Sequence, residues 1–89
     1  MRYGVKYSDR AVKALQKMDR PIAAMLYAWI SKNLEGCSNP RASGKALAGD
    51  KKGMWRYRVG DYRIIAVIDD GQVTINLIHI AHRRDAYAQ

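Results

Sequence analysis

The chain is 89 residues long, and its 16 Lys and Arg outnumber its 8 Asp and Glu to give a formal net charge of +8. A chain of this length builds one hydrophobic core, so we expect a single domain over residues 1–89. No apolar stretch approaches the ~18 residues of a membrane span, and residues 1–6 alternate polar and apolar side chains instead of forming the apolar part of a signal peptide. These features favour a cytoplasmic protein without membrane association. The positive charge favours a polyanionic partner, because phosphate groups attract it and release counterions on contact.

The first half of the chain predicts one strand followed by two helices. Residues 2–7 alternate in the period of a half-buried strand. Ser8 is a suitable N-cap for a short helix that ends near Asp19. Pro21 suits the first turn of a second helix, which ends at Gly36. The apolar side chains of this second helix recur at three- and four-residue spacing, which predicts a face buried in the core; they are Ile22, Met25, Leu26, Trp29, Ile30 and Leu34.

The second half predicts a basic loop and three strands. Residues 37–53 are rich in Gly, Ser, Asn and Lys, which indicates a long loop. Short turn signals then separate three apolar-rich runs, which read as an antiparallel meander over 54–59, 62–68 and 72–80. The order β-α-α-β-β-β predicts an α+β fold, in which a helical hairpin packs on one face of a mainly antiparallel four-stranded sheet.

Three arginines are expected on the other face of this sheet. A two-residue turn at Gly60 and Asp61 pairs Arg58 with Arg63, and strand alternation places Arg56 on the same face as Arg58. Like charges directly opposite one another destabilise a sheet, unless an anion lies between them. Guanidinium groups suit phosphate, because they present a planar fork of donors. The alternative is an ordinary solvated face whose charges pair with nearby aspartates.

The second hairpin is expected to turn at Asp70 and Gly71, which pairs Arg63 with Ile78. This register puts one apolar set toward the helices and leaves Ile78, Ile80 and His82 on the arginine face. His79 and His82 then point to opposite faces and lack companion ligands, so we expect no metal site.

Further cations are expected near the same rim of the sheet. The loop and the tail supply them: Arg41, Lys45, Lys51, Lys52, Arg83 and Arg84. A phosphate backbone with a base stacked on Tyr87 is the ligand that this set fits.

Two segments carry a resemblance to a known family. They read W-R-Y-R-V-G-D-Y-R-I-I at 55–65 and H-I-A-H-R-R-D-A-Y at 79–87, with K-A-L-A-G at 45–49. Over nearly its whole length the chain resembles the RelE branch of the RelE/ParE toxin superfamily. The resemblance implies the RelE-like fold and ribosome-dependent cleavage of mRNA in the A site, with contacts to 16S rRNA. It also implies a RelB-like antitoxin as partner, and a reaction that needs no metal and no cofactor.

The same resemblance assigns roles to residues by position. It places Arg56, Arg58, Arg63, Arg83 and Tyr87 in the catalytic site, where a ribose 2′-hydroxyl attacks the adjacent phosphate. The best-known member has lysine, a proposed general base, at the position of Arg58, and a guanidinium gives up its proton only reluctantly. Because the imidazole of histidine titrates near neutral pH, His82 is the alternative base or acid. RNA or ribosome binding is expected of Arg41, Lys45, Lys51, Lys52 and Arg84.

Two other functions remain open on the sequence. A ParE-like toxin of similar fold would inhibit DNA gyrase by binding, without cutting RNA. A catalytically inactive relative would only bind its antitoxin or an operator complex, and it would not arrest growth when expressed alone.

Overall fold

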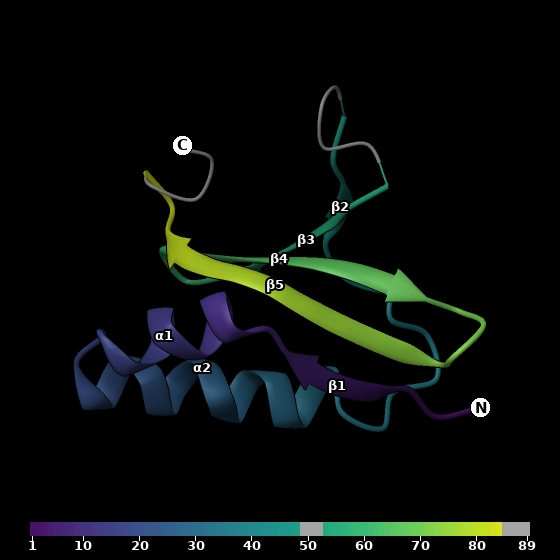
Figure 1. Cartoon of the computed structure of the whole chain (residues 1–89), viewed down its shortest axis with the longest axis horizontal. Coiled ribbons are helices and arrows are strands. Elements are labelled where there is room, and N and C mark those ends of the chain that lie inside the picture. The colour runs from purple at the N-terminus through teal and green to yellow at the C-terminus, as the bar shows by residue number, and fades with distance from the viewer. Residues whose placement is uncertain (49–52, 85–89) are drawn as a thin grey trace.

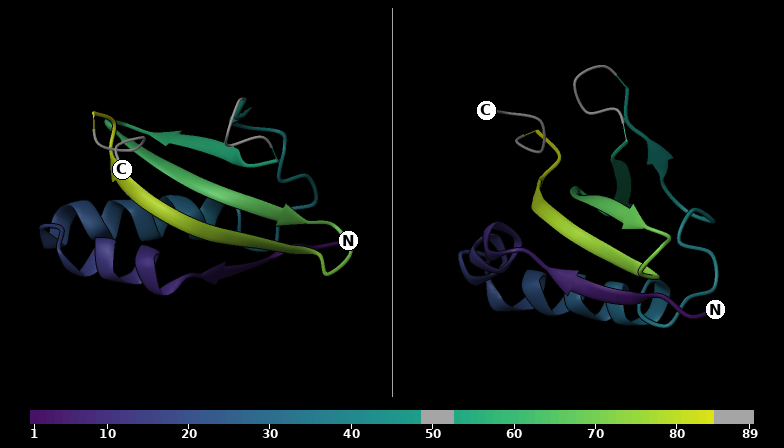
Figure 2. Two further views of the ribbon diagram at one scale, coloured as in Figure 1. Left: turned by 45° about the horizontal axis from the view of Figure 1, so that its top comes forward. Right: turned by 45° about the vertical axis from the view of Figure 1, so that its right-hand side comes forward.

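A computed structural model of the chain describes residues 1–48 and 53–84. Within these residues, strands form one mixed sheet and two helices cover one of its faces (Figure 1). The elements are β1 Gly4–Tyr7, α1 Asp9–Gln16, α2 Arg20–Asn33, β2 Lys45–Ala46, β3 Trp55–Val59, β4 Tyr62–Asp69 and β5 Thr74–His82. The strand order is β1-β5-β4-β3-β2, with β1 parallel to β5 and the other neighbours antiparallel. Figure 2 shows both helices on the same side of the sheet.

The predicted α+β fold and its helical hairpin are confirmed, and the sheet has one strand more than expected. The four expected strands are present, and the loop between α2 and β3 adds the short strand β2, which pairs Lys45 with Arg56 and Ala46 with Trp55. The indole N–H of Trp55 donates to the carbonyl oxygen of Ser43 at 2.7 Å. This bond ties the loop to β3 at the start of the extra strand.

Local signals set both helices. The hydroxyl of Ser8 accepts a hydrogen bond from the amide of Ala11 at 3.0 Å, as expected of an N-cap. Pro21 lies in the first turn of α2, and Gly36 follows the helix with φ +78°. None of the described helices is long and apolar enough to span a membrane.

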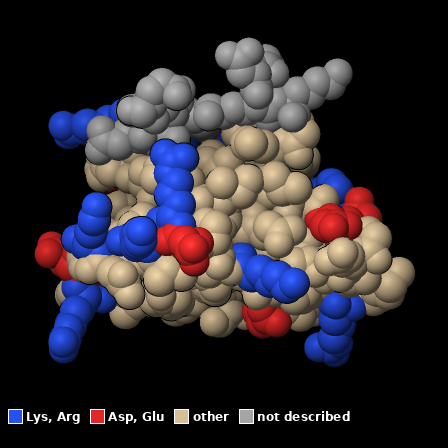
Figure 3. Space-filling model, viewed as in Figure 1, with Lys and Arg blue, Asp and Glu red and all other residues tan. Residues whose placement is uncertain are grey.

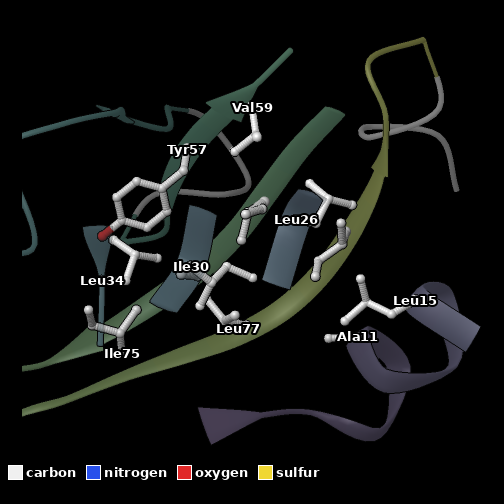
Figure 4. Packing of buried hydrophobic residues seen from close by; sticks show 12 residues of the cluster. Ala11, Leu15, Leu26, Ile30, Leu34, Tyr57, Val59, Ile75 and Leu77 are labelled. Atoms are coloured by element: carbon white, nitrogen blue, oxygen red, sulfur yellow. The ribbon is translucent and has the colours of Figure 1, made fainter. Parts of the chain in front are cut away.

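The core lies between the helices and the face of the sheet that they cover. Figure 4 shows Tyr57 reaching from β3 toward Leu34, the residue that follows α2, with Leu77 of β5 pointing into the same space. Tyr57 is fully buried, and its hydroxyl donates to the carbonyl oxygen of Pro40 at 2.6 Å. Burial raises the pKa of Tyr57 to about 12. The buried apolar set includes Leu15, Leu26, Ile30, Leu34, Val59, Ile64, Ile75, Leu77 and Ile80.

The register of the second hairpin differs from the prediction. The turn is longer, so Asp69 pairs with Thr74, and Arg63 pairs with Ala81 instead of Ile78. An extra residue in β5 adds to the effect of the longer turn: Ile65 pairs with His79 and Ala66 with Leu77, which leaves Ile78 as a β-bulge. Because side chains alternate between faces, the bulge exchanges the faces of all the residues that follow it. Ile80 therefore lies in the core, 1% exposed, and not on the arginine face.

Candidate nucleic-acid interface

The arginine face forms on β3 and β4, as the first hairpin predicts. Arg58 pairs directly with Arg63, so that part of the prediction is confirmed. Arg56 lies two residues before Arg58 on β3 and points to the same side of the sheet. Their neighbours Tyr57, Val59 and Ile64 face the helices and are buried. The three arginines therefore lie on the face of the sheet that α1 and α2 leave uncovered.

The extra strand adds a second pair of like charges to this face. Lys45 on β2 lies directly opposite Arg56, next to the pair of Arg58 and Arg63. Lys45 and Arg58 are exposed, and neither has an ion-pair partner among the described residues. Each opposed pair destabilises the sheet by roughly 0.2–1 kcal/mol. Two such pairs side by side form a surface that an anion stabilises.

Arg63 is the most enclosed of these cations. Its side chain is half-buried, and its Nε and Nη1 atoms are shielded from solvent. Electrostatic attraction is stronger where water is excluded, since the local dielectric constant is lower. Arg63 therefore contributes its positive charge to this face from a partly enclosed position.

The end of β5 brings two further arginines to this site. Arg83 and Arg84 directly follow β5 and are exposed. The amide of Arg83 donates to the carbonyl oxygen of Asp61 at 2.6 Å, which fixes this segment beside the turn between β3 and β4. This turn carries Arg58 and Arg63 at its base, so the structure brings Arg83 to the same end of the sheet.

His82 does not join the arginine face. It pairs with Tyr62, and the two rings meet edge to face with 5.3 Å between their centroids. Tyr62 packs against the core, so His82 lies on the side of the sheet that faces the helices. The predicted placement of His82 is wrong, because the bulge at Ile78 was not foreseen. His79 points to the arginine face, opposite to His82. The described residues contain no group of three or more His, Cys, Asp and Glu that could hold a metal ion.

Arg41 lies at the end of the sheet away from Arg63 and Arg83, where it lines a hollow with Ala46 and Trp55. Its guanidinium holds the carboxylate of Asp70 through two bonds of 3.0 Å, and the hydroxyl of Tyr3 donates to the same carboxylate at 2.6 Å. The bonds from Arg41 and then Tyr3 lower the pKa of Asp70. Asp70 follows the end of β4, roughly 23 Å from Arg63 at the usual rise of a strand. The expectation that Arg41 lies near Arg63 and Arg83 is therefore wrong. Lys51, Lys52 and Tyr87 lie outside the described residues.

A second basic area, which the sequence prediction missed, lies on α1. Arg10, Lys13 and Lys17 line a hollow of about 450 Å³ together with His79 of β5. Figure 3 shows Lys and Arg side chains gathered over the part of the molecule where α1 lies. The signal was present in the sequence, since residues three and four apart share one face of a helix. This second basic area therefore borders β5 at His79.

Comparisons with known proteins agree with the fold. Residues 5–87 match the family model described as ParE toxin of type II toxin-antitoxin system, parDE. The chain is 36% identical over 85 residues to Toxin RelE of Mycobacterium tuberculosis, which covers 96% of this chain and 86% of the relative. It is 30% identical over 87 residues to Toxin RelG of the same organism, with 98% of both chains covered. Among solved structures, the toxin-antitoxin complex RelBE2 of M. tuberculosis contains a chain that matches with a TM-score of 0.85 and 28% identity, over 96% of this chain and 95% of that one.

Proposed function

We propose that this chain, which belongs to the ParE toxin family of type II toxin-antitoxin systems and is a RelE-type toxin, cuts messenger RNA in the ribosomal A site. The observation that carries the proposal is the presence of two opposed pairs of like charges on the uncovered face of the sheet, Lys45 with Arg56 and Arg58 with Arg63. A fold that keeps four cations so close loses stability, and a bound phosphate offsets the loss. The chain acts where ribosomes are, in the cytoplasm.

The chemistry that suits this site is attack within the RNA itself. The 2′-oxygen of one ribose forms a bond to the adjacent phosphorus, and the bond from phosphorus to the 5′-oxygen breaks. The products are a cyclic phosphate and a 5′-hydroxyl, after one proton has left the 2′-hydroxyl and one has reached the leaving oxygen. The guanidiniums of Arg56, Arg58 and Arg63 stabilise the additional negative charge on the phosphate, and Arg83 contacts the same group.

The histidine expected to serve as base or acid, His82, does not lie on this face, and His79, which does, pairs with Ile65 and lines the hollow beside α1. His82 lies on the opposite side of the sheet end, and a guanidinium group is a poor general base. We therefore expect the arginines to contribute charge stabilisation and orientation, while the ribosome holds the mRNA in line. His82→Gln should leave the cleavage rate within about threefold and its pH profile unchanged, whereas loss of a general base or acid costs ~10²–10⁴-fold. A hundredfold loss with a changed pH profile would restore His82 to the chemistry.

A RelB-like antitoxin is the proposed partner that keeps the toxin inactive. The similar M. tuberculosis structure is a toxin-antitoxin complex. An antitoxin segment rich in acidic residues would complement the basic face that Lys45, Arg58 and Arg84 expose. In the absence of the antitoxin, the same exposed cations, with Lys51 and Lys52, would contact mRNA and 16S rRNA. Expression of the chain alone should arrest growth, and stable, harmless expression without a partner would count against this part of the proposal.

The test of the proposed reaction is primer extension on mRNA in a purified translation system. Wild type should cut within A-site codons and leave free RNA intact. Arg63→Ala should lower the cleavage rate by ~10²–10³-fold, as expected for the loss of one charge-stabilising donor. Lys32→Ala is the matched control, because Lys32 is an exposed cation in the last turn of α2, away from the arginine face. Uncut mRNA in the presence of folded wild-type protein would contradict the proposal.

The match to the ParE toxin model supports one alternative, inhibition of DNA gyrase by binding. That activity does not require a phosphate site on the sheet. It predicts inhibited supercoiling of plasmid DNA, uncut mRNA, and no effect of Arg63→Ala on either assay.

A further inference from the structure

A hollow of about 240 Å³ opens at the edge of β3, beside the arginine face. It is lined by Trp29, Ser43, Gly44, Lys45, Arg56, Tyr57 and Arg58. The hollow exists because β2 pairs only with Trp55 and Arg56, so the preceding loop leaves the edge of β3 at Tyr57. The indole of Trp29, on α2, lines the hollow from the side of the sheet that the helices cover. Three segments that are distant in sequence thus surround one space.

Trp29 is the aromatic surface that this hollow offers to a ligand. One side of the indole packs against the ring of Tyr57, with 5.8 Å between ring centroids. Trp29 remains half-buried, and its indole N–H has no hydrogen-bond acceptor among the described residues. The hydroxyl of Tyr57 is already bonded to Pro40. Trp29 was expected to belong only to the core, and the structure gives it a second, accessible side.

The rim and the far wall of the hollow complete a site for a nucleotide. Lys45, Arg56 and Arg58 place three cations along the rim, continuous with Arg63. The opposite wall is bare backbone at Gly44, where φ is +83° and a Cβ would collide with the carbonyl oxygen of Arg56. Only glycine lets the loop come this close to β3. The wall therefore presents peptide groups to a ligand instead of a side chain.

We propose that this hollow binds one nucleobase of a single-stranded RNA, held against the indole of Trp29, while the flanking phosphates contact Lys45, Arg56 and Arg58. An aromatic ring beside a row of cations is the arrangement with which proteins hold single-stranded nucleic acid. The volume is below the ~300–1,000 Å³ of pockets for drug-sized ligands, which suits a single base. The inference rests on the proposed function for its choice of RNA as ligand. It makes Trp29 a residue that positions the message beside the arginines.

The test uses two synthetic oligonucleotides of six residues: a single-stranded RNA, and an abasic ribose-phosphate chain of equal charge. Binding is measured by anisotropy of a terminal label at low salt, without ribosomes. Wild type should bind the RNA about tenfold more tightly than the abasic chain, since stacking of one base on an aromatic side chain is worth ~1–3 kcal/mol. The RNA, but not the abasic chain, should also quench tryptophan fluorescence.

Three variants locate the effect. Trp29→Leu should bind the two oligonucleotides equally, whereas Trp29→Phe should keep most of the preference for RNA but lose the quenching. Tyr27→Leu is the matched control, because Tyr27 is an aromatic side chain of α2 that is 43% exposed and does not line the hollow. Thermal melts confirm that each variant is folded.

Several results would overturn the inference. Equal binding of both oligonucleotides by wild type, or an RNA preference that survives Trp29→Leu, would show that no base lies on Trp29. Failure to bind either oligonucleotide would also exclude the site. A preference for RNA that depends on Trp29, in a protein that does not cut mRNA on the ribosome, would retain the pocket and reject the proposed reaction.

Discussion

Removal of Arg58 should stabilise the fold while it abolishes function. Arg58 is exposed and lies directly opposite Arg63, and an opposed pair of like charges destabilises a sheet by ~0.2–1 kcal/mol. Arg58→Gln keeps much of the side-chain length and removes the charge, so the free energy of unfolding should rise by about 0.5 kcal/mol at low salt. For a domain of this size, that change raises Tm by roughly 2–4 °C. The same variant should lose most A-site cleavage.

Two properties of this rise in the free energy of unfolding distinguish charge repulsion from other causes. It should disappear in 1 M salt, where the Debye length is only ~3 Å, and it should be close to zero in an Arg63→Gln background. Lys6→Gln is the matched control, because Lys6 is an exposed strand cation that pairs with Asn76, a neutral residue. Chemical denaturation of the four proteins of the cycle, at low and high salt, gives the required free energies. The same stabilisation with and without Arg63, or none at low salt, would refute the reasoning.

Three further predictions concern stability. Val73 is a β-branched residue at φ 52°, so Val73→Asn should raise the free energy of unfolding by ~1 kcal/mol in denaturant titrations; a decrease would show that the turn is not strained. The pKa of Asp70 is lowered by Arg41, so its contribution is present above the unfolded-state pKa of ~3.9 and is lost as pH falls through the folded value. Asp70→Asn should therefore reduce the dependence of Tm on pH below about 4, and an unchanged slope would argue against the ion pair in solution. Gly44→Ala should lower Tm more than Gly53→Ala, because both glycines have positive φ but only at Gly44 does a Cβ meet the backbone of β3; equal losses would exclude the close contact.

The first hairpin could be predicted because its signals are local. Gly60 and Asp61 mark a two-residue turn, and a turn of fixed length determines every pairing that follows, including Arg58 with Arg63. Helix α2 was predictable for a similar reason, since Pro21 marks its start and Gly36 follows its end. In both cases the information lies within a few residues of the feature that it specifies.

The register of β5 depends on residues that are distant in sequence. Apolar side chains occupy both faces around Leu77, Ile78 and Ile80, so strict alternation does not reveal where the phase changes. The spacing of three between the buried residues Leu77 and Ile80 is the signal that a bulge leaves. The strand β2 is too short to show any period, and the pair of Arg41 with Asp70 joins two loops that no pattern of charge connects.

Ser8 links the start of the fold to the geometry of the site. Its hydroxyl accepts from the amide of Ala11 to cap α1, and donates to the carbonyl oxygen of the bulged residue Ile78 at 2.8 Å. One short side chain thus holds a helix terminus against the irregular point of β5. The bulge then determines that Ala81, a small residue, lies opposite Arg63, while His82 faces the core side. The position of Arg63 opposite a small residue therefore follows from a single extra residue in β5, and α1 is anchored at that residue.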